Sequence, residues 1–341
     1  MRTPAFVAEV SANHLGKYER ALALVEAAAA AGASAVKFQT YDPDRLVGNH
    51  NVVIEDGPWA GQKMIDLYRR AATPREWLPD LFEVARRLGM VPFSSPFARE
   101  DVDFLEDLGA ELYKIASFEI VDLDLIARVG ETQKPIVIST GMASLDEIER
   151  AVDVASEAGA TAITLLRCTS AYPTPIEDAN LASIRTLADY FSHDPLISIG
   201  LSDHTLGTVA GVAAIALGAV MVEKHLTLLR SDGGPDAGFS AEPAEFAELV
   251  RVGRLTARAL GRSEVEPTEL EVPQKQLRRA LWVVADVREG EAFTRANLRS
   301  CRPSFGKPCL PIEVWLGSYA ARDVDAGTMF EPSLAKGEPP G

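Results

Sequence analysis

The stretch that decides the fold runs from Leu196 to Thr227 and reads LISIGLSDHTLGTVAGVAAIALGAVMVEKHLT. Two short apolar runs, Leu196 to Leu201 and Ala219 to Val222, flank a segment rich in glycine and alanine that is long enough for one helix. Two strands joined by one helix are normally parallel neighbours, with their carboxyl ends at the same edge of the sheet. The stretch therefore predicts one β-α-β unit.

A histidine follows each of the two apolar runs. His204 ends the cluster SDH, and His225 ends the cluster EKH, in which Glu223 and His225 share one face of the strand. The level strand ends bring His204 and His225 together, which favours a divalent-metal half-site with open positions. The alternative is that each histidine forms only local hydrogen bonds at its strand end.

The composition limits the class of protein. With 341 residues the chain is longer than a typical single domain, which predicts one large barrel or two domains. Hydrophobic residues make up 47% and charged residues 24% of the chain, as in an ordinary globular protein. The net charge of −15, without a long basic run, argues against nucleic-acid binding, while a site for a small anion needs only a local cluster.

The three cysteines, Cys168, Cys301 and Cys309, show no CxxC spacing, so we expect reduced thiols and a cytoplasmic protein. The N-terminal sequence enters a strand-like run directly, without the apolar region of a signal peptide. The longest apolar stretches are too short to cross a membrane, so we expect no membrane partner.

Strand-like runs alternate with helical segments from the start of the chain. The runs are Ala5 to Val10, Ala35 to Thr40, Val91 to Ser94, Leu112 to Ala116, Pro135 to Ser139, Ala162 to Leu166, Leu196 to Leu201 and Ala219 to Glu223. Helical spacing marks Arg20 to Ala31, Pro74 to Leu88, Ala98 to Leu108, Leu145 to Glu157 and Glu242 to Leu260. Eight such units over about 250 residues predict an α/β fold, a (β/α)8 TIM barrel with its active-site groups at the carboxyl ends of the strands. A doubly wound open sheet is the alternative.

The chain divides by composition into a catalytic barrel at 1–261, an acidic linker with several prolines at 262–275 and a small domain at 276–336. The small domain is too short to be stable alone, so we expect it to dock on the barrel or on a partner subunit. Its short strands and turns are predicted at Ala280 to Val284, Glu289-Gly290, Cys301 to Pro303 and Trp315 to Tyr319.

Asn49 to Leu67 forms an insertion after the second predicted strand, with a turn at Gly57-Pro58-Trp59. Insertions at that edge of a barrel often shape the substrate pocket. A plain surface elaboration explains the segment equally well.

Polar residues gather at the ends of the predicted strands, where a barrel otherwise packs apolar side chains. Lys37 and Gln39 share a face of the second strand, and Lys114, Ser117 and Glu119 lie at the mouth of the fourth. Each lysine alone could be a rim residue, but two lysines with several hydroxyls favour a site for phosphate and carboxylate groups. Glu119 is a candidate general acid or base, unless it only pairs with a lysine. These residues predict a metal-assisted reaction between a phosphorylated, carboxylated small molecule and an electrophile.

Eight ordered motifs resemble the sialic acid synthase family. They read AEVSANHLG, VKFQTYDPDRL, PFSSPF, YKIASFE, ISTGMAS, CTSAYPTPIEDANL, GLSDHTLG and EKHLT. The C-terminal stretch RRALWVVADVREGEAFTRANLRSCRPSFG is similar to the antifreeze-like (SAF) domain of that family. The resemblance implies condensation of phosphoenolpyruvate with the open-chain aldehyde of an acetamido sugar, giving a nine-carbon 2-keto-3-deoxy acid and phosphate. It also implies Mn²⁺ or Mg²⁺, and a domain-swapped homodimer in which the small domain of one subunit covers the barrel of the other.

The resemblance also implies roles for individual residues. The metal ligands would be His204 and His225, with Glu223 a weaker candidate. Catalysis would involve Glu119, Lys114 and the two histidines. Phosphoenolpyruvate would be bound by Lys37, Gln39, Ser95, Lys114, Ser117, Ser139, Ser170 and Ser202. The sugar would contact Glu9, Asn13, Tyr172, Asp236 and Arg302, with Ser240 in the same loop as Asp236, although that glycine-rich loop is otherwise an ordinary turn.

Five details resemble the branch of the family that makes pseudaminic acid: SANHLG, FSSPFAREDVDFL, YKIASFE, DLYRRAATPREW and RPSFG. The acceptor would then be 2,4-diacetamido-2,4,6-trideoxy-L-altrose. The same chemistry on N-acetylmannosamine or on the legionaminic acid precursor is the nearest alternative. A metal-dependent aldolase that uses pyruvate, and a non-catalytic binding protein on a barrel scaffold, are the more distant ones.

Overall fold

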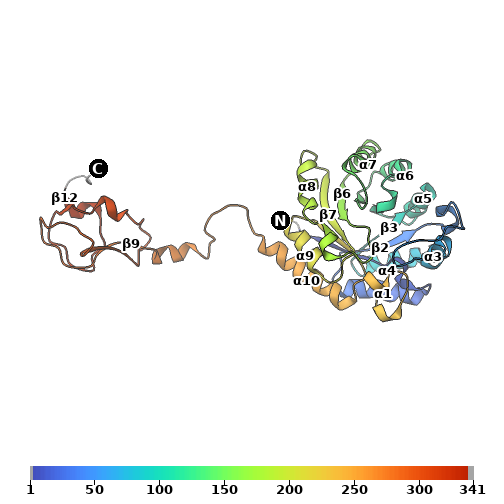
Figure 1. Ribbon diagram of the computed structural model, residues 1–341, viewed down its shortest axis with the longest axis horizontal. Helices are drawn as coiled ribbons and strands as arrows, with labels where there is room; N and C mark the ends of the chain where they lie inside the picture. Colours follow the sequence, from blue (N-terminus) through green and yellow to red (C-terminus); the bar gives the residue numbers. More distant parts are fainter. Residues whose placement is uncertain (1–2, 337–341) are drawn as a thin grey trace. The chain divides into compact units, whose positions relative to one another are not determined.

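A closed barrel of eight parallel strands forms the first part of the protein (Figure 1). The structure, a computed structural model, describes residues 3–336. It separates into two compact units, Met1–Gly261 and Arg262–Gly341. The barrel strands are β1 (Ala5–Glu9), β2 (Ala35–Thr40), β3 (Val91–Pro96), β4 (Tyr113–Ile115), β5 (Ile136–Ser139), β6 (Ile163–Cys168), β7 (Ile197–Asp203) and β8 (Met221–His225). The predicted TIM barrel is confirmed, and the open sheet is excluded because β1 pairs with β8.

Helices cover the outside of the barrel (Figure 1). They are α1 (Tyr18–Ala30), α2 (Pro43–Leu46), α3 (Met64–Ala71), α4 (Leu78–Arg87), α5 (Arg99–Asp107), α6 (Leu123–Gly130), α7 (Leu145–Glu157), α8 (Ser183–Tyr190), α9 (Val209–Ala216) and α10 (Pro243–Ala259). In the longer helices, such as α4 and α7, apolar residues recur three and four positions apart and form a buried face. Within residues 3–336, no helix is both long enough and apolar enough to cross a membrane.

Local sequence signals explain where the helices begin. Ser144 and Glu147 form a capping box at α7, in which the Glu147 amide donates to Ser144 Oγ at 3.3 Å and the Ser144 amide donates to Glu147 Oε2 at 2.8 Å. The predicted helix at Pro74 to Leu88 is interrupted by a 3-10 turn at Arg75–Trp77 that precedes α4. The insertion after β2 closes on itself through a bridge between Val53 and Lys63, and then continues into α3.

The barrel is apolar at the amino ends of its strands and polar at their carboxyl ends. Val7, Ala35 and Phe93 form a small buried cluster inside the amino-terminal end. The larger apolar core lies between the strands and the helices. In the strand register, Glu9 stands beside both Lys37 and His225. The register therefore brings the predicted site residues of distant segments to one end of the barrel.

The second unit contains two small antiparallel sheets. One pairs β9 (Ala280–Val283) with β10 (Leu298–Cys301), and the other pairs β11 (Tyr319–Ala320) with β12 (Ala335–Lys336). Of the stretches predicted as short strands and turns, Cys301 to Pro303 begins at the last residue of β10, and Trp315 to Tyr319 forms a turn that leads into β11. Trp315 packs into the apolar core of this unit instead of continuing a strand.

Candidate active site

Two lysines and two glutamates form a buried network of opposite charges at the carboxyl ends of the strands. Lys37 Nζ lies 2.5 Å from Glu9 Oε2 and 3.8 Å from Glu223 Oε1. Lys114 Nζ lies 3.9 Å from the same Glu223 oxygen. None of the four residues is more than 4% exposed. The two predicted lysines therefore point into the barrel, where glutamates balance their charges.

The neighbours of each lysine decide its charge, because burial alone lowers the pKa of an ammonium group. Around Lys37, Glu223 and Glu9 outweigh burial, and the pKa of Lys37 is raised. For Lys114, burial outweighs the attraction of Glu223, and its pKa is lowered. The pKa of Glu223 is lowered, since Lys114 and Lys37 overcome the opposing effect of burial. The ammonium form is therefore less stable for Lys114 than for Lys37, and a bound anion would stabilise it more.

Two serine hydroxyls extend this network. Lys37 Nζ donates to Ser95 Oγ at 3.5 Å. Ser202 Oγ donates to Glu223 Oε1 at 3.3 Å. These contacts place both predicted hydroxyls beside the ionisable groups, where they can donate to a bound anion.

A second group of hydroxyls meets at Gly141. A Cβ atom at Gly141 would lie 2.2 Å from Ser170 Oγ and 2.7 Å from Ser117 Oγ, so only glycine fits there. The Gly141 amide donates to Ser117 Oγ at 3.2 Å. Ser139 Oγ is buried and has no hydrogen-bond partner among residues 3–336. This group forms a compact set of donors with unused capacity for a ligand.

The rings of His204 and His225 lie side by side, with their centroids 5.4 Å apart. His204 Nδ1 lies 3.0 Å from the carbonyl oxygen of Thr169. A carbonyl only accepts, so Nδ1 carries a hydrogen and Nε2 is the nitrogen left for a metal. Burial lowers the pKa of His204, but the Cys168 thiol and the Thr169 carbonyl outweigh it, and the pKa is raised. His225 Nδ1 is buried without a hydrogen-bond partner in the described chain. Burial and then the nearby cations lower the pKa of His225 well below its usual value, which keeps the ring neutral and able to bind a metal.

The two histidines fit a divalent cation as a half-site. Among the described residues, no group of three or more histidine, cysteine, aspartate or glutamate side chains lies close enough to hold a metal. Glu223 faces the lysines and Ser202, and Asp236 Oδ2 lies 3.9 Å from His225 Nδ1. The ligand role of Glu223 stays a prediction, and the remaining coordination positions are open to water or substrate oxygens.

Glu119 lies on the short 3-10 turn Ser117–Glu119 that follows β4. Its Oε2 atom is buried and has no hydrogen-bond partner among the residues described. Burial raises the pKa of Glu119 to about 7, although Lys114 opposes this effect. A carboxyl with this pKa exchanges a proton readily near neutral pH, as a general acid or base must.

The loop after β8 is tied to the segment after β1 by hydrogen bonds. Ser11 Oγ donates to Asp236 Oδ2 at 2.5 Å and accepts from Gln39 Nε2 at 3.0 Å. Asn13 Nδ2 donates to Ser240 Oγ at 2.8 Å, and Ser240 Oγ donates to the Asp236 carbonyl at 2.6 Å. The predicted residues of this loop therefore form one connected group beside the histidines.

Aromatic rings cover one side of the histidine pair. Tyr172, predicted to contact the sugar, lies with its ring centroid 4.5 Å from that of His204. Trp59 and Phe239 join it, with centroids 5.4 Å and 5.0 Å from that of Tyr172. The sequence motifs did not identify these two residues. The one available signal was the turn at Gly57-Pro58-Trp59 in the insertion.

Cys168 was also overlooked as a neighbour of the site. Its Sγ lies 3.8 Å from His204 Nδ1 at the end of β6. Burial alone would raise the pKa of the thiol, but His204 and other neighbours lower it to about 7. No sequence pattern predicts this contact, because it depends on the spacing of β6 and β7.

Arg302 lies in the second unit and is exposed. It borders a hollow of about 710 Å³ whose other cationic residues are Lys275, Arg278, Arg279 and Lys307. Among residues 3–336, no carboxylate lines this hollow, although Lys307 pairs with Glu331 outside it. The predicted contact between Arg302 and a sugar in another barrel stays a prediction.

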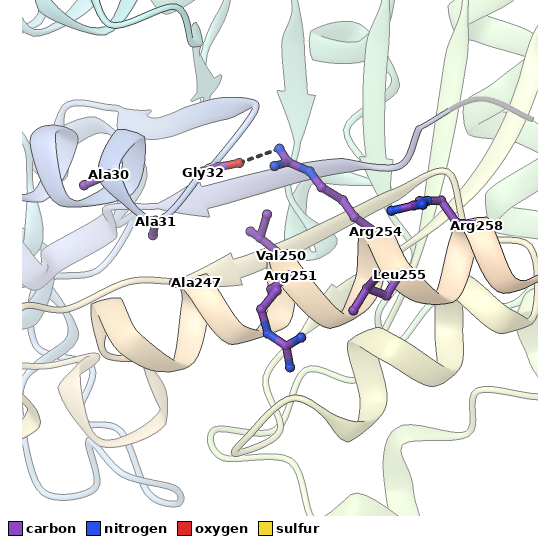
Figure 2. A pocket seen from close by; sticks show the side chains of 9 residues that line it. All are labelled: Ala30, Ala31, Gly32, Ala247, Val250, Arg251, Arg254, Leu255 and Arg258. Atoms are coloured by element: carbon purple, nitrogen blue, oxygen red, sulfur yellow. Dashed lines mark hydrogen bonds between the residues drawn. The ribbon is translucent and has the colours of Figure 1, made fainter.

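Another hollow, of about 410 Å³, lies between the end of α1 and α10 (Figure 2). Arg254 Nη2 donates to the Gly32 carbonyl at 3.0 Å, and Arg251 pairs with Glu248 at 2.8 Å (Figure 2 shows the first contact). Arg254 therefore binds the backbone just after α1, and Arg251 pairs within α10. None of the predicted site residues lines this hollow.

Comparisons with known proteins agree with this geometry. A model of the NeuB family matches residues 24–265. The chain is 39% identical over 330 residues to a pseudaminic acid synthase of Campylobacter jejuni, covering 96% of this chain and 95% of that protein. A pseudaminic acid synthase of Helicobacter pylori is 39% identical over 333 residues, or 96% of each chain. The crystal structure of an N-acetylneuraminic acid synthetase from Leptospira borgpetersenii, in complex with citrate, has a TM-score of 0.73 and 31% identity, covering 80% of this chain and 90% of that one.

Proposed function

This chain belongs to the NeuB family, the family of sialic acid synthases, and from that premise we propose that it condenses phosphoenolpyruvate with an open-chain acetamido sugar. The acceptor is 2,4-diacetamido-2,4,6-trideoxy-L-altrose, and the products are pseudaminic acid and phosphate, as the names of the two synthases suggest. The carboxyl end of the barrel, where the site residues meet, is called the barrel mouth. The observation that carries this proposal is the presence of two buried lysines and two neighbouring histidines in this mouth.

The lysines and hydroxyls bind phosphoenolpyruvate. Lys37 and Lys114 supply positive charge inside the barrel, and Ser139 and Ser170 supply donors near its end. Ammonium and hydroxyl donors suit both the phosphate and the carboxylate of this substrate. The network of Lys37 with Glu9 and Glu223 fixes the donors before substrate arrives, which lowers the cost of positioning C3 for attack.

His204 and His225 would hold the divalent cation, Mn²⁺ or Mg²⁺, through Nε2 of His204 and a ring nitrogen of His225. When bound, such a cation polarises a carbonyl oxygen as a Lewis acid. The Thr169 carbonyl fixes the orientation of the His204 ring, so that Nε2 points away from the backbone contact.

Glu119 handles the proton of the water that enters the reaction. A carbon–carbon bond forms between C3 of phosphoenolpyruvate and the aldehyde carbon, which leaves C2 cationic. Water adds to C2 and gives one proton to the Glu119 carboxylate. The C2–O bond to phosphate then breaks, the water oxygen stays as the ketone, and the phosphate leaves with the former bridging oxygen. Overall, one water is consumed, and its protons go to the new hydroxyl and to the phosphate.

We also infer that the protein works in the cytoplasm as a homodimer, with Arg302 of each subunit serving the barrel of the other. Support comes from the three free cysteines and from the hollow around Arg302, which is lined with cations. Measuring the mass of the protein in solution tests the dimer. A monomer with full activity would contradict the role of Arg302 across subunits.

Phosphate release from phosphoenolpyruvate with Mn²⁺ tests the reaction. We expect rapid release with 2,4-diacetamido-2,4,6-trideoxy-L-altrose and slow release with N-acetylmannosamine or the legionaminic acid precursor. Faster release with one of the other sugars would keep the chemistry and overturn the choice of acceptor. Release of phosphate with none of these sugars would overturn the proposed function.

A further inference from the structure

Three aromatic residues from distant parts of the chain form a continuous wall beside the histidines. Trp59 comes from the insertion after β2, Tyr172 from the loop after β6, and Phe239 from a short turn after β8. The ring centroid of Phe239 lies 5.0 Å from that of His225, and the centroids of Trp59 and Phe239 are 6.4 Å apart. The wall therefore borders the position where the histidines would hold the reacting end of the acceptor.

The position of Trp59 in this wall is fixed. Its indole Nε1 donates to the Pro235 carbonyl at 2.9 Å, in the loop that also carries Asp236. The insertion itself is closed by two backbone hydrogen bonds. The Ile54 amide donates to the Gln62 carbonyl at 3.0 Å, and the Gly61 amide donates to the Ile54 carbonyl at 2.8 Å. Because the one polar atom of the indole is already bonded, Trp59 presents only an apolar surface to a ligand.

The burial of the wall decreases outward from the core. Phe239 is 3% exposed, whereas Tyr172 and Trp59 are half-buried. An aromatic residue that served only to pack the insertion would have its ring covered by apolar neighbours. The ring of Trp59 contacts the rings of Tyr172 and Phe239, and each of these two rings also contacts a histidine ring.

From these contacts we propose that Trp59 is a specificity-determining residue, which selects an acceptor whose far end carries a methyl group in place of a hydroxymethyl group. This inference rests on the proposed function and deepens it. A methyl group gains by contact with the faces of Trp59 and Phe239, whereas a hydroxyl in the same place loses water and finds no polar partner on those two rings. Because an apolar pocket rejects an added hydroxyl only moderately, the wall prefers the methyl sugar by about 10- to 100-fold.

The test compares two acceptors that differ by one hydroxyl: 2,4-diacetamido-2,4,6-trideoxy-L-altrose and the same sugar with its 6-hydroxyl. For each, kcat/KM is measured by phosphate release in the wild type and in Trp59→Ala and Trp59→Phe. We expect Trp59→Ala to reduce the preference for the methyl sugar about tenfold, with the KM for phosphoenolpyruvate changed less than twofold. Trp59→Phe keeps an apolar ring and retains most of the preference. Val53→Ala, on the same insertion but outside the wall, leaves it unchanged.

The outcomes separate this inference from the proposed function. If Trp59→Ala lowers kcat/KM equally for both sugars, or leaves both unchanged, Trp59 does not determine specificity and the inference is wrong, while the reaction stands. If Trp59→Phe loses the preference as fully as Trp59→Ala, the apolar ring is not the cause. If the wild type releases no phosphate with either sugar, the proposed function fails, and this inference fails with it.

Discussion

The barrel mouth and the C-terminal unit both gather cationic side chains, but they hold them differently. In the mouth, Lys37 and Lys114 are 3% and 2% exposed and face Glu9 and Glu223. In the C-terminal unit, Arg302 is exposed at the edge of a hollow to which the described part of the chain contributes no carboxylate. Buried charges interact strongly with fixed partners, whereas exposed charges are screened by salt. The comparison indicates that the carboxyl end of the barrel can orient a substrate, and it predicts that the proposed contact of Arg302 is weaker and depends on salt.

We expect the replacement of Lys37 to have the largest effect on activity among the variants considered. In Lys37→Met, we expect kcat/KM for phosphoenolpyruvate to fall about 1,000-fold, because a fixed donor is lost. The free energy of unfolding should also fall by about 3–5 kcal/mol, since Glu9 is left buried without its cation. Phosphate release and urea unfolding measure the two effects.

The double variant Lys37→Met/Glu9→Leu separates stability from function. Removing both charges should restore most of the lost stability without restoring activity. A single variant with activity near the wild type would show that Lys37 does not bind substrate, and the contrast with the C-terminal unit would fail.

The histidines test whether the mouth contains the metal site. His204→Ala and His225→Ala should each weaken Mn²⁺ binding at least about 100-fold, as followed by electron paramagnetic resonance at fixed pH. His193→Ala, at an exposed position in the turn after α8, is the matched control and should bind Mn²⁺ normally. If a variant without both His204 and His225 binds Mn²⁺ as the wild type does, the ligand assignment is wrong.

The protonation of Glu119 should make kcat depend on pH. Its pKa of about 7 means that the ionised base becomes more abundant as the pH rises from 6 to 8, so kcat should rise with pH and level off above about 7. Glu119→Gln should lower kcat about 100-fold at pH 8 and flatten this profile. An unchanged profile in the variant would remove Glu119 from the mechanism.

The Glu119 carboxyl should lower the free energy of unfolding as the pH rises, whereas it should raise kcat. A raised pKa means that the folded protein binds the proton more tightly than the unfolded chain, so stability falls as the pH rises from 4.5 towards 7. Glu119→Gln should therefore be more stable than the wild type at pH 8, by up to about 3 kcal/mol, and similar to it at pH 4.5. Urea unfolding at the two pH values measures this difference.

The smallest effect is expected at the C-terminal unit. Arg302→Ala should raise the KM for the acceptor sugar about tenfold and leave the KM for phosphoenolpyruvate unchanged, and added salt should shrink the difference. Arg288→Ala, on the same unit, removes a side chain that is 86% exposed and should change neither constant. Equal effects of the two variants would remove Arg302 from its proposed role.

The barrel was predictable because its signals are local and repeated. Each apolar run ends in a polar cluster, and parallel strands must place those clusters at one edge. This rule predicts that His204 and His225 are neighbours, and the observed distance of 5.4 Å between their ring centroids confirms it. The rule could not supply the pairing of Lys37 with Glu9 and Glu223, which depends on register and side-chain length.

The aromatic wall was not predictable for a different reason. Trp59 lies in an insertion without helical or strand periodicity, so the sequence left open whether that segment reaches the site or only decorates the surface. The hydrogen bond of Trp59 to Pro235 and its ring contacts settle where it lies. In the C-terminal unit, Trp315 looked like part of a strand because a buried aromatic residue gives the same short apolar signal.

The most direct test of the central claim uses phosphoenolpyruvate with ¹⁸O in the oxygen that bridges C2 and phosphorus. The protein, Mn²⁺ and 2,4-diacetamido-2,4,6-trideoxy-L-altrose are added, and the masses of the phosphate and of the nine-carbon acid are measured together. Condensation in the barrel mouth predicts equal amounts of both products, with the label in the phosphate and none in the acid. Label retained in the acid, or phosphate released without the acid, would contradict it.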